Sequence, residues 1–210
     1  MADFSVRIPT GGVQLEGDLS LPRGASGVIA FAHGSGSSRL SPRNAAVAAY
    51  LRQTGRFGTL LFDLLTERED AVYATRFDIR LLAERLQAAT EWLRSRPDVV
   101  GLPLGYFGAS TGAAAALAAA SRRDDVAAVV SRGGRPDLAG DALAGVTAPT
   151  LLIVGGDDTE VIELNRRAMA AMPGTVELTI VPGATHLFEE PGTLEEVARL
   201  TRGWFERYLG

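Results

Sequence analysis

Short apolar runs alternate along the chain with longer segments whose apolar residues recur at helical spacing. Continuous apolar runs such as Gly27–Ala32 and Phe57–Phe62 are typical of strands that are buried on both faces of a parallel sheet. Helical periodicity follows each run, from Pro42 to about Gln53 and again over Arg76–Arg96. The pattern predicts βαβ units with right-handed crossovers.

Near the start of the chain, Phe4–Ile8 and Val13–Leu21 alternate apolar and polar residues on either side of a Gly-containing turn. They predict an antiparallel hairpin at a sheet edge. A further strand is expected in the apolar run from Leu104 to its break at Gly108. Later elements are expected at Val126–Val130 (strand), near Leu138–Leu143 (short helix), at Thr150–Val154 (strand), over about Val161–Met172 (helix), at Val176–Val181 (strand) and over about Leu194–Leu209 (helix). We therefore expect a single α/β domain over residues 1–210, with a mostly parallel sheet of about eight strands and helices on both faces.

One apolar run, Leu104–Leu117, breaks at the pentapeptide Gly108-Ala-Ser-Thr-Gly112 and continues as an alanine-rich helix. A serine between two glycines, after a strand and before a helix, is typical of a nucleophile elbow, in which a strained turn exposes the hydroxyl group. Such pentapeptides also arise by chance in a chain rich in Gly and Ala, so an ordinary strand-to-helix turn is the alternative. The motif makes Ser110 the candidate nucleophile.

Composition narrows the class of partner. The 21 basic and 25 acidic residues give a net charge of −4, which does not favour capture of nucleic acid or of an anionic membrane. The absence of cysteine excludes disulfides, thiolate catalysis and cysteine-based metal sites. The first residues lack the charged and apolar regions of a signal peptide, and no run is long enough to span a bilayer. We expect a cytoplasmic protein acting on a small molecule; its oligomeric state is left open.

A serine nucleophile requires a base and a carboxylate that orients the base. The chain has two histidines, and His186 follows the last expected strand, whereas His33 precedes the serine in a Gly/Ser loop and is expected to be structural. The order Ser, acid, His places the acid after the strand Thr150–Val154, where Asp157 and Asp158 are adjacent. Asp158 is favoured, with Asp157 as a cap of the next helix. Each of these residues alone could equally be an ordinary cap or loop residue.

Ester cleavage also needs hydrogen-bond donors for the developing oxyanion. The backbone amides of Thr111, directly after the serine, and of Ser35, in the loop after Gly27–Ala32, are the expected donors. A phosphate cradle in that loop is disfavoured, because it lacks both the Gly-x-x-x-x-Gly-Lys motif and the Gly-x-Gly-x-x-Gly spacing. Without a His-Glu-x-x-His pattern, we expect neither a metal nor a cofactor.

Four motifs together resemble those of the α/β-hydrolases and, within that fold, of the small lidless dienelactone hydrolase family. They are His33-Gly34, Gly108-Ala-Ser-Thr-Gly112, Gly155-Gly-Asp-Asp158 and Gly183-Ala-Thr-His186. The resemblance implies a triad of Ser110, Asp158 and His186 and hydrolysis of esters or lactones through an acyl-enzyme. The dienelactone hydrolases proper use a cysteine nucleophile, whereas this chain has Ser110.

The segment between the strands Val126–Val130 and Thr150–Val154 is too short for a separate cap domain, so the site is expected to be open. This segment contains Arg132 and Arg135, and the loop on the oxyanion side adds Arg39 and Arg43. Arg39, Arg132 and Arg135 are candidates for binding a substrate carboxylate, because a guanidinium group matches a carboxylate in a bidentate way. Pairing of these arginines with Asp63, Asp137 or Glu189 is the alternative.

The sequence thus predicts a serine hydrolase that cleaves small carboxylic esters or lactones. The same triad would also serve a thioesterase, an amidase or a carbon–carbon bond hydrolase, because the triad does not choose the leaving group. A binding module that retains the hydrolase fold without turnover is the alternative from another class.

Overall fold

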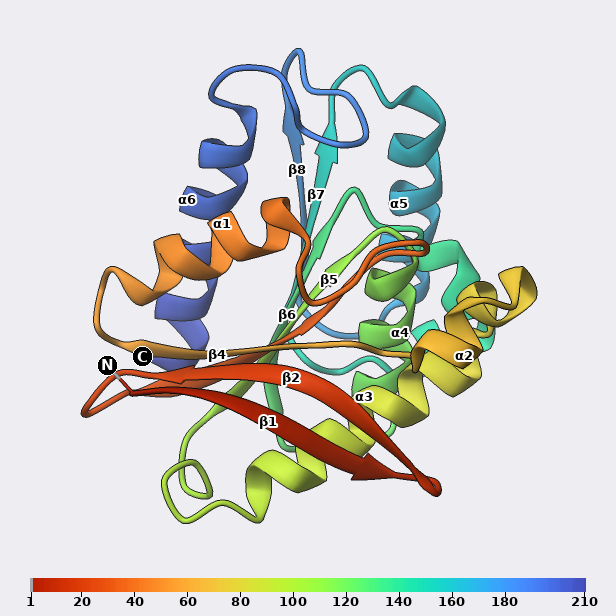
Figure 1. The fold of residues 1–210 in the computed structure, drawn as a ribbon. Coiled ribbons are helices and arrows are strands. Elements are labelled where there is room, and N and C mark those ends of the chain that lie inside the picture. The colour runs from red at the N-terminus through yellow and green to blue at the C-terminus, as the bar shows by residue number, and fades with distance from the viewer. Residues whose placement is uncertain (1) are drawn as a thin grey trace.

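A computed structural model describes residues 2–210 and contains one eight-stranded sheet in the order β1-β2-β4-β3-β5-β6-β7-β8 (Figure 1). The strands are β1 (Ala2–Thr10), β2 (Val13–Leu21), β3 (Gly27–Ala32), β4 (Phe57–Phe62), β5 (Leu104–Ala109), β6 (Val126–Arg132), β7 (Thr150–Gly155) and β8 (Val176–Val181). Strands β1 and β2 form the antiparallel hairpin, and β2 pairs antiparallel with β4. All other pairs are parallel, which confirms the expected α/β architecture.

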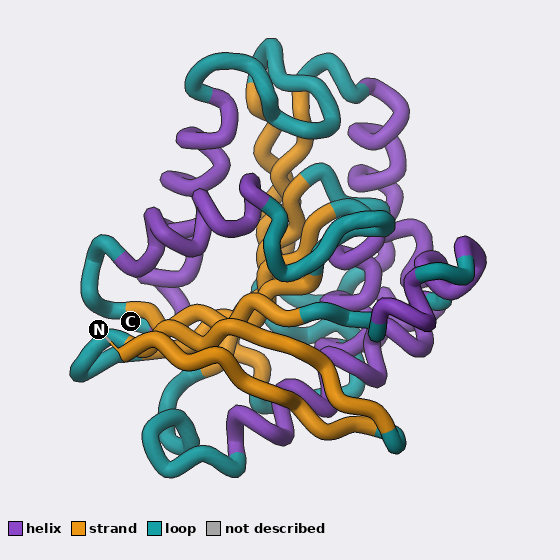
Figure 2. The backbone as a smooth tube through the Cα atoms, in the orientation of Figure 1, coloured by secondary structure: helices purple, strands orange, loops and turns teal. Residues whose placement is uncertain are grey.

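Helices cover both faces of the sheet (Figures 1 and 2). They are α1 (Pro42–Arg52), α2 (Glu67–Asp70), α3 (Ile79–Arg94), α4 (Thr111–Ala120), α5 (Thr159–Ala171) and α6 (Thr193–Leu209), with the 3₁₀ segments η1 (Tyr73–Phe77) and η2 (Pro136–Gly145). Helices α1 and α6 pack on one face, whereas α3, α4 and α5 lie on the other. The two large buried apolar clusters correspond to these two faces, as expected for a sheet whose central strands are apolar throughout.

The segment after β4 is the part that the apolar pattern misses. The helix expected from Arg76 begins only at Ile79, because the Asp78 side chain accepts the Leu81 N–H and caps it. Before it come α2 and η1, and α2 begins with a reciprocal capping box between Thr66 and Glu69. These short helices expose much of their surface, so apolar periodicity could not indicate them.

Helix α6 lies tightly against the middle of the sheet. A Cβ atom at Gly105 in β5 would lie 2.6 Å from Cε1 of Phe205, so glycine allows the phenyl ring to rest on the strand. Phe205 is fully buried and also packs edge-on against Phe57, with ring centroids 6.5 Å apart. This ring therefore joins α6 to strands on both sides of the centre. In residues 2–210, every helix is too short or too polar to cross a lipid bilayer.

We predict that Phe205→Ala lowers the free energy of unfolding by about 3–5 kcal/mol, because the ring leaves a cavity between α6 and β5. Urea denaturation followed by circular dichroism measures it. Arg199→Ala on the same helix removes a largely exposed pair with Glu196 and should cost only a small fraction of that loss. Equal losses in the two variants would contradict the packing described here.

Candidate active site

The candidate residues follow strands whose carboxyl ends meet at one edge of the sheet (Figure 1). Because β3, β5, β6, β7 and β8 are parallel, the loops that leave them converge there. Ser110 directly follows β5, Arg132 ends β6, Asp158 follows β7 and His186 follows β8. Residues that are distant in the sequence are thus brought together by topology alone.

Ser110 occupies a strained backbone conformation, with φ 51° and ψ −120°. Positive φ is rare for residues other than glycine. Within residues 2–210, Ser110 and Phe188 are the only non-glycine residues that have it. Hydrogen bonds hold the turn in place: the Ser110 N–H donates to Arg132 O at 3.2 Å, and the Ser110 carbonyl accepts from Ala113 N and Arg135 N, both at 3.1 Å. Such strain persists only where the surroundings enforce it.

The two glycines of the pentapeptide are required by close backbone contacts. A Cβ atom at Gly108 would lie 2.4 Å from Ala113 Cα, and one at Gly112 would lie 2.2 Å from Ala32 O. Neither neighbour is a flexible side chain that could move aside. Such close contacts and a strained serine between them are what a nucleophile elbow requires.

His186 and Asp158 form a short hydrogen bond, with 2.6 Å between Nδ1 and Oδ2. A carboxylate can only accept, so Nδ1 carries the proton and Nε2 is left as an acceptor. His186 and Ser110 line one cavity of about 250 Å³, which we call the Ser110 cavity. Within residues 2–210 no hydrogen bond joins the Ser110 hydroxyl to the imidazole; such contacts often tighten only when substrate binds.

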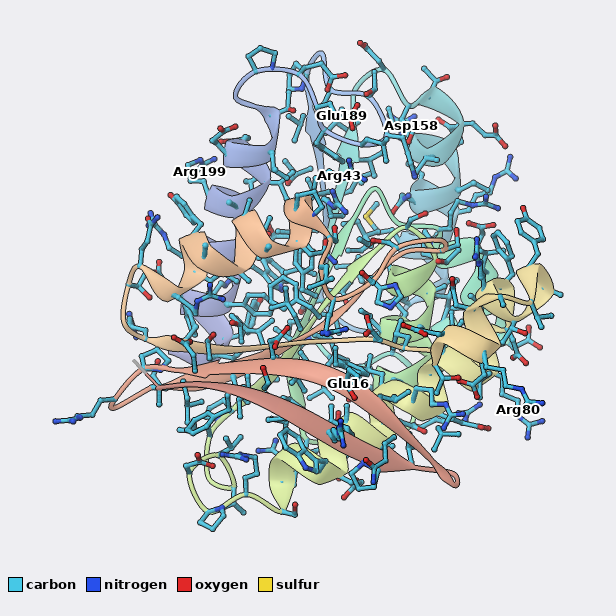
Figure 3. All side chains as sticks on the ribbon, in the orientation of Figure 1. Glu16, Arg43, Arg80, Asp158, Glu189 and Arg199 are labelled. Atoms are coloured by element: carbon cyan, nitrogen blue, oxygen red, sulfur yellow. The ribbon has the colours of Figure 1, made fainter. Side chains whose placement is uncertain are left out.

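Of the two adjacent aspartates, Asp158, which Figure 3 labels, is hydrogen-bonded to His186, and Asp157 is exposed. The expectation that Asp157 caps the next helix is wrong, because Asp158 occupies the N-cap position of α5. In the described residues the Asp158 side chain makes no capping bond, and its carboxylate is directed to His186 instead. The Asp157 N–H donates to Ala184 O at 3.0 Å and ties this loop to the one that carries His186.

Glu190 fixes the turn before His186, and the sequence analysis did not identify it. Its carboxylate accepts the Thr185 N–H at 3.1 Å and the Thr185 hydroxyl at 2.5 Å. These bonds, the hydroxyl bond foremost, lower the pKa of Glu190 below its usual value. Phe188, buried and with φ 56°, anchors the far side of the same turn. No motif in the sequence signals this arrangement, because it depends on the fold of the turn.

The expected oxyanion donors lie next to the serine. Ser35 and Thr111 line a common small cleft, and a Cβ atom at Gly34 would lie 3.1 Å from Ser110 Cβ, so the loop after β3 passes against the elbow. In the part of the chain that the structure describes, neither the Ser35 N–H nor the Thr111 N–H donates to a protein acceptor. Both amides are therefore available to a ligand.

His33 is built into the structure behind this loop. Its Nε2 accepts the Leu64 N–H at 3.0 Å, and its Nδ1 donates to Gly34 O at 2.9 Å. Burial lowers the pKa of His33 below its usual value of 6.5, against weaker opposing effects of the Gly34 bond and Asp63. The neutral ring thus braces the loop that carries Ser35.

Two of the three candidate arginines are paired away from the Ser110 cavity. Arg39 lies 2.5 Å from Asp63, and Arg135 lies 2.8 Å from Asp137. The structure therefore contradicts a free guanidinium group at either position. Arg132 differs: it is buried, it lines the Ser110 cavity, and no carboxylate pairs with it among residues 2–210. Burial, and then the charge of Arg43, lower the pKa of Arg132 to about 10.

The described residues hold no group of three or more His, Cys, Asp or Glu side chains that could bind a metal ion. The groups at this edge of the sheet are instead a strained serine, an imidazole oriented by a carboxylate, and two free amides. Together they can activate a hydroxyl group and stabilise an oxyanion.

Fold and site geometry define the class of α/β-hydrolases. The sequence model of the dienelactone hydrolase family matches residues 52–207, and the chain belongs to that family. Membership of this family supports hydrolase activity.

Solved structures extend the match to the whole chain. The crystal structure of a dienelactone hydrolase from Anabaena variabilis ATCC 29413 is 53% identical, covers 100% of this chain and 99% of its own, and has a TM-score of 0.96. Est1E from Butyrivibrio proteoclasticus has a TM-score of 0.82 at 16% identity, covering 97% of this chain and 98% of its own. At that identity the similarity to Est1E concerns the fold alone.

Curated relatives include proteins of two Mycobacterium tuberculosis strains, CDC 1551 / Oshkosh and H37Rv, each 60% identical over 210 residues. Both carry the name "Putative phosphoribosyl transferase". The match covers 100% of this chain but 47% of each relative, so the chain spans about half of their length.

We predict that His33 makes the protein less stable in mild acid. Because the folded state binds this proton more weakly than the unfolded state, the free energy of unfolding should fall as the pH drops below about 6.5. His33→Gln keeps one donor and one acceptor but cannot titrate, so it should remove this part of the pH dependence. Urea denaturation of the wild type and of His33→Gln between about pH 5 and pH 8 measures the effect. The other titrating groups are the same in both proteins, so their contributions cancel when the two curves are subtracted. Parallel curves would contradict the assignment.

Proposed function

We propose that the protein is a serine hydrolase that cleaves small carboxylic esters or lactones through an acyl-enzyme. The observation that carries this proposal is the strained Ser110 turn in one cavity with the imidazole of the Asp158–His186 pair. Family membership supports hydrolase chemistry in general. The proposal adds the bond cleaved and the residues that cleave it.

In the acylation step, Ser110 Oγ attacks the ester carbonyl carbon while His186 Nε2 takes the hydroxyl proton. The negative charge that develops on the carbonyl oxygen is stabilised by the amides of Ser35 and Thr111, and loss of one such donor typically costs about 10²–10³ in rate. Thr111 begins α4, so the positive end of the helix dipole favours the same charge. Collapse of this intermediate breaks the ester bond, and His186 returns the proton to the leaving alcohol.

In the deacylation step, His186 takes a proton from the water that attacks the acyl-enzyme. It then returns this proton to Ser110 Oγ as the bond to the acyl group breaks and the carboxylic acid is released. Asp158 holds the His186 ring in one tautomer and stabilises the imidazolium that forms in both steps. The short η2 segment, Pro136–Gly145, stands where a cap domain would be inserted. This supports small substrates that reach an open site.

The triad itself does not choose between an ester, a thioester, an amide and a carbon–carbon bond. Comparing rates on chromogenic esters, thioesters and anilides of one acyl group separates these reactions. The name of the M. tuberculosis relatives belongs to proteins about twice as long. For the half that this chain matches, the site residues favour hydrolysis over phosphoribosyl transfer.

We predict that Asp158→Asn lowers kcat by about 10⁴-fold on 4-nitrophenyl acetate, because an amide at this position no longer holds the productive tautomer of His186. Asp157→Asn is the matched control: the same substitution one residue earlier, on an exposed side chain, should change kcat by less than about twofold. Steady-state rates of release of 4-nitrophenol measure both. A larger loss in the Asp157 variant would reverse the assignment.

Covalent labelling tests the enzyme against a catalytically inactive binding module. A fluorophosphonate probe should label the wild-type protein, and Ser110→Ala should abolish labelling and ester hydrolysis while circular dichroism shows that the variant is folded. Failure of the folded wild type to react with the probe would refute the proposed function.

A further inference from the structure

The Ser110 cavity has a positively charged wall. Arg132 and Arg43 both line it, together with Asn44, Ser110 and His186. Among the described residues that line this cavity, none is a carboxylate. Arg43 reaches from α1 to Glu189 on the loop after β8, with 2.9 Å between Nη1 and Oε1 (Figure 3). Arg132 therefore faces a second cation and no anion.

Arg132 is 7% exposed and makes one weak side-chain contact, Nη2 to Asn44 Oδ1 at 3.4 Å. Its Nε and Nη1 atoms are buried and have no acceptor within residues 2–210. A buried, unpaired charge is among the most costly features a fold can contain, and such charges are normally paired. Burial lowers the pKa of Arg132, and the positive charge of Arg43 lowers it further.

The other arginines near this edge of the sheet behave differently. Arg39, Arg135 and Arg43 each have a carboxylate partner within hydrogen-bond distance. Arg132 is thus an exception among its neighbours, and it stands at the end of β6 opposite the residue that precedes the nucleophile, because Ala109 and Arg132 are paired across the sheet.

We propose that the substrate carries an anionic oxygen group, a carboxylate or a phosphate, which binds Arg132 and is shared with Arg43. This inference rests on the proposed function and names the chemical class of the substrate. Arg132 lines the cavity, and a planar guanidinium group can donate two hydrogen bonds to the two oxygen atoms of one anion. The Asn44 side chain, already in contact with Arg132, lies on the same wall.

The position of the two groups limits the substrate. Arg132 and Ser110 line the same cavity, and Arg132 is paired across the sheet with Ala109, the residue before Ser110. An anionic group on Arg132 and a carbonyl at Ser110 must therefore belong to one compact molecule, with only a few bonds between them. The anion binds in the ground state and in the transition state alike, so it should act mainly on KM.

Matched substrates test this inference. One series is made of 4-nitrophenyl esters whose acyl chains are of equal length and end in methyl, carboxylate or phosphonate; the other is made of acetate esters of phenol, 4-hydroxybenzoate and 4-hydroxyphenylphosphonate. We expect kcat/KM to be about 10- to 100-fold higher for an anionic member than for the neutral one in at least one series, mainly through KM. Comparing carboxylate with phosphonate identifies which anion the site prefers. The rate measured with Ser110→Ala is subtracted from every value.

Arg132→Met keeps the length of the side chain and removes the charge, and it should bring the ratio of anionic to neutral kcat/KM close to one. Arg132→Lys keeps the charge but loses the two-pronged geometry, so an intermediate ratio is expected. Arg80→Met is the control, because Arg80 pairs with Glu84 on the outer surface of α3, and it should leave the ratio unchanged.

Two results would overturn the inference: a wild type without preference for an anionic member in either series, or a preference that persists in Arg132→Met. If Arg132→Met does not fold, Arg132→Lys decides the question: a ratio of anionic to neutral kcat/KM equal to that of the wild type overturns the inference. A wild type that neither hydrolyses esters nor reacts with fluorophosphonate refutes the proposed function alone. The anion subsite is then decided by calorimetric titration of succinate and inorganic phosphate into the wild type and Arg132→Met, where equal or absent binding contradicts it.

Discussion

The strained turn at Ser110 is the constraint on which the rest of the site depends. Its positive φ is maintained by one short segment: Arg132 O accepts the Ser110 N–H, and Arg135 N donates to the Ser110 carbonyl. Asn165, buried in α5, secures that segment by donating from Nδ2 to Gly134 O at 3.0 Å. The same segment carries the side chain of Arg132. Ser110 and the cationic wall of its cavity are therefore both held by this piece of backbone.

Much of the fold was predictable because the central strands are apolar throughout and the helices between them keep their periodicity. The strained turn at Ser110 was predictable because Gly108 and Gly112 are needed where backbone atoms approach closely. His186 was the candidate base because the chain has only two histidines and His33 precedes the serine. The structure gives His33 a structural role, since its buried ring accepts the Leu64 N–H. The choice of Asp158 over Asp157 depended on the register of one loop, which local propensity describes poorly.

Other features could not be read from the sequence, because they depend on contacts between distant segments. The sequence offered pairing with Asp63 or Glu189 as one of two interpretations, but Arg39 and Asp63 are 24 residues apart and Arg43 and Glu189 are 146 apart, so it could not choose between a paired and a free guanidinium group. Nothing in the sequence separates Arg132, which is unpaired, from Arg135, which is paired with Asp137 two residues later. The short helices α2 and η1 depend on capping bonds and not on apolar periodicity.

Rapid mixing of the enzyme with 4-nitrophenyl acetate tests the role of Ser110 most directly. If Ser110 is the nucleophile and deacylation is the slower step, 4-nitrophenol is released in an initial burst of about one equivalent per chain. Acid quenching followed by peptide mass spectrometry should then find the acetyl group on Ser110. An acetyl group on another residue, or turnover with no acetyl group on Ser110 at any time after mixing, would contradict the central claim.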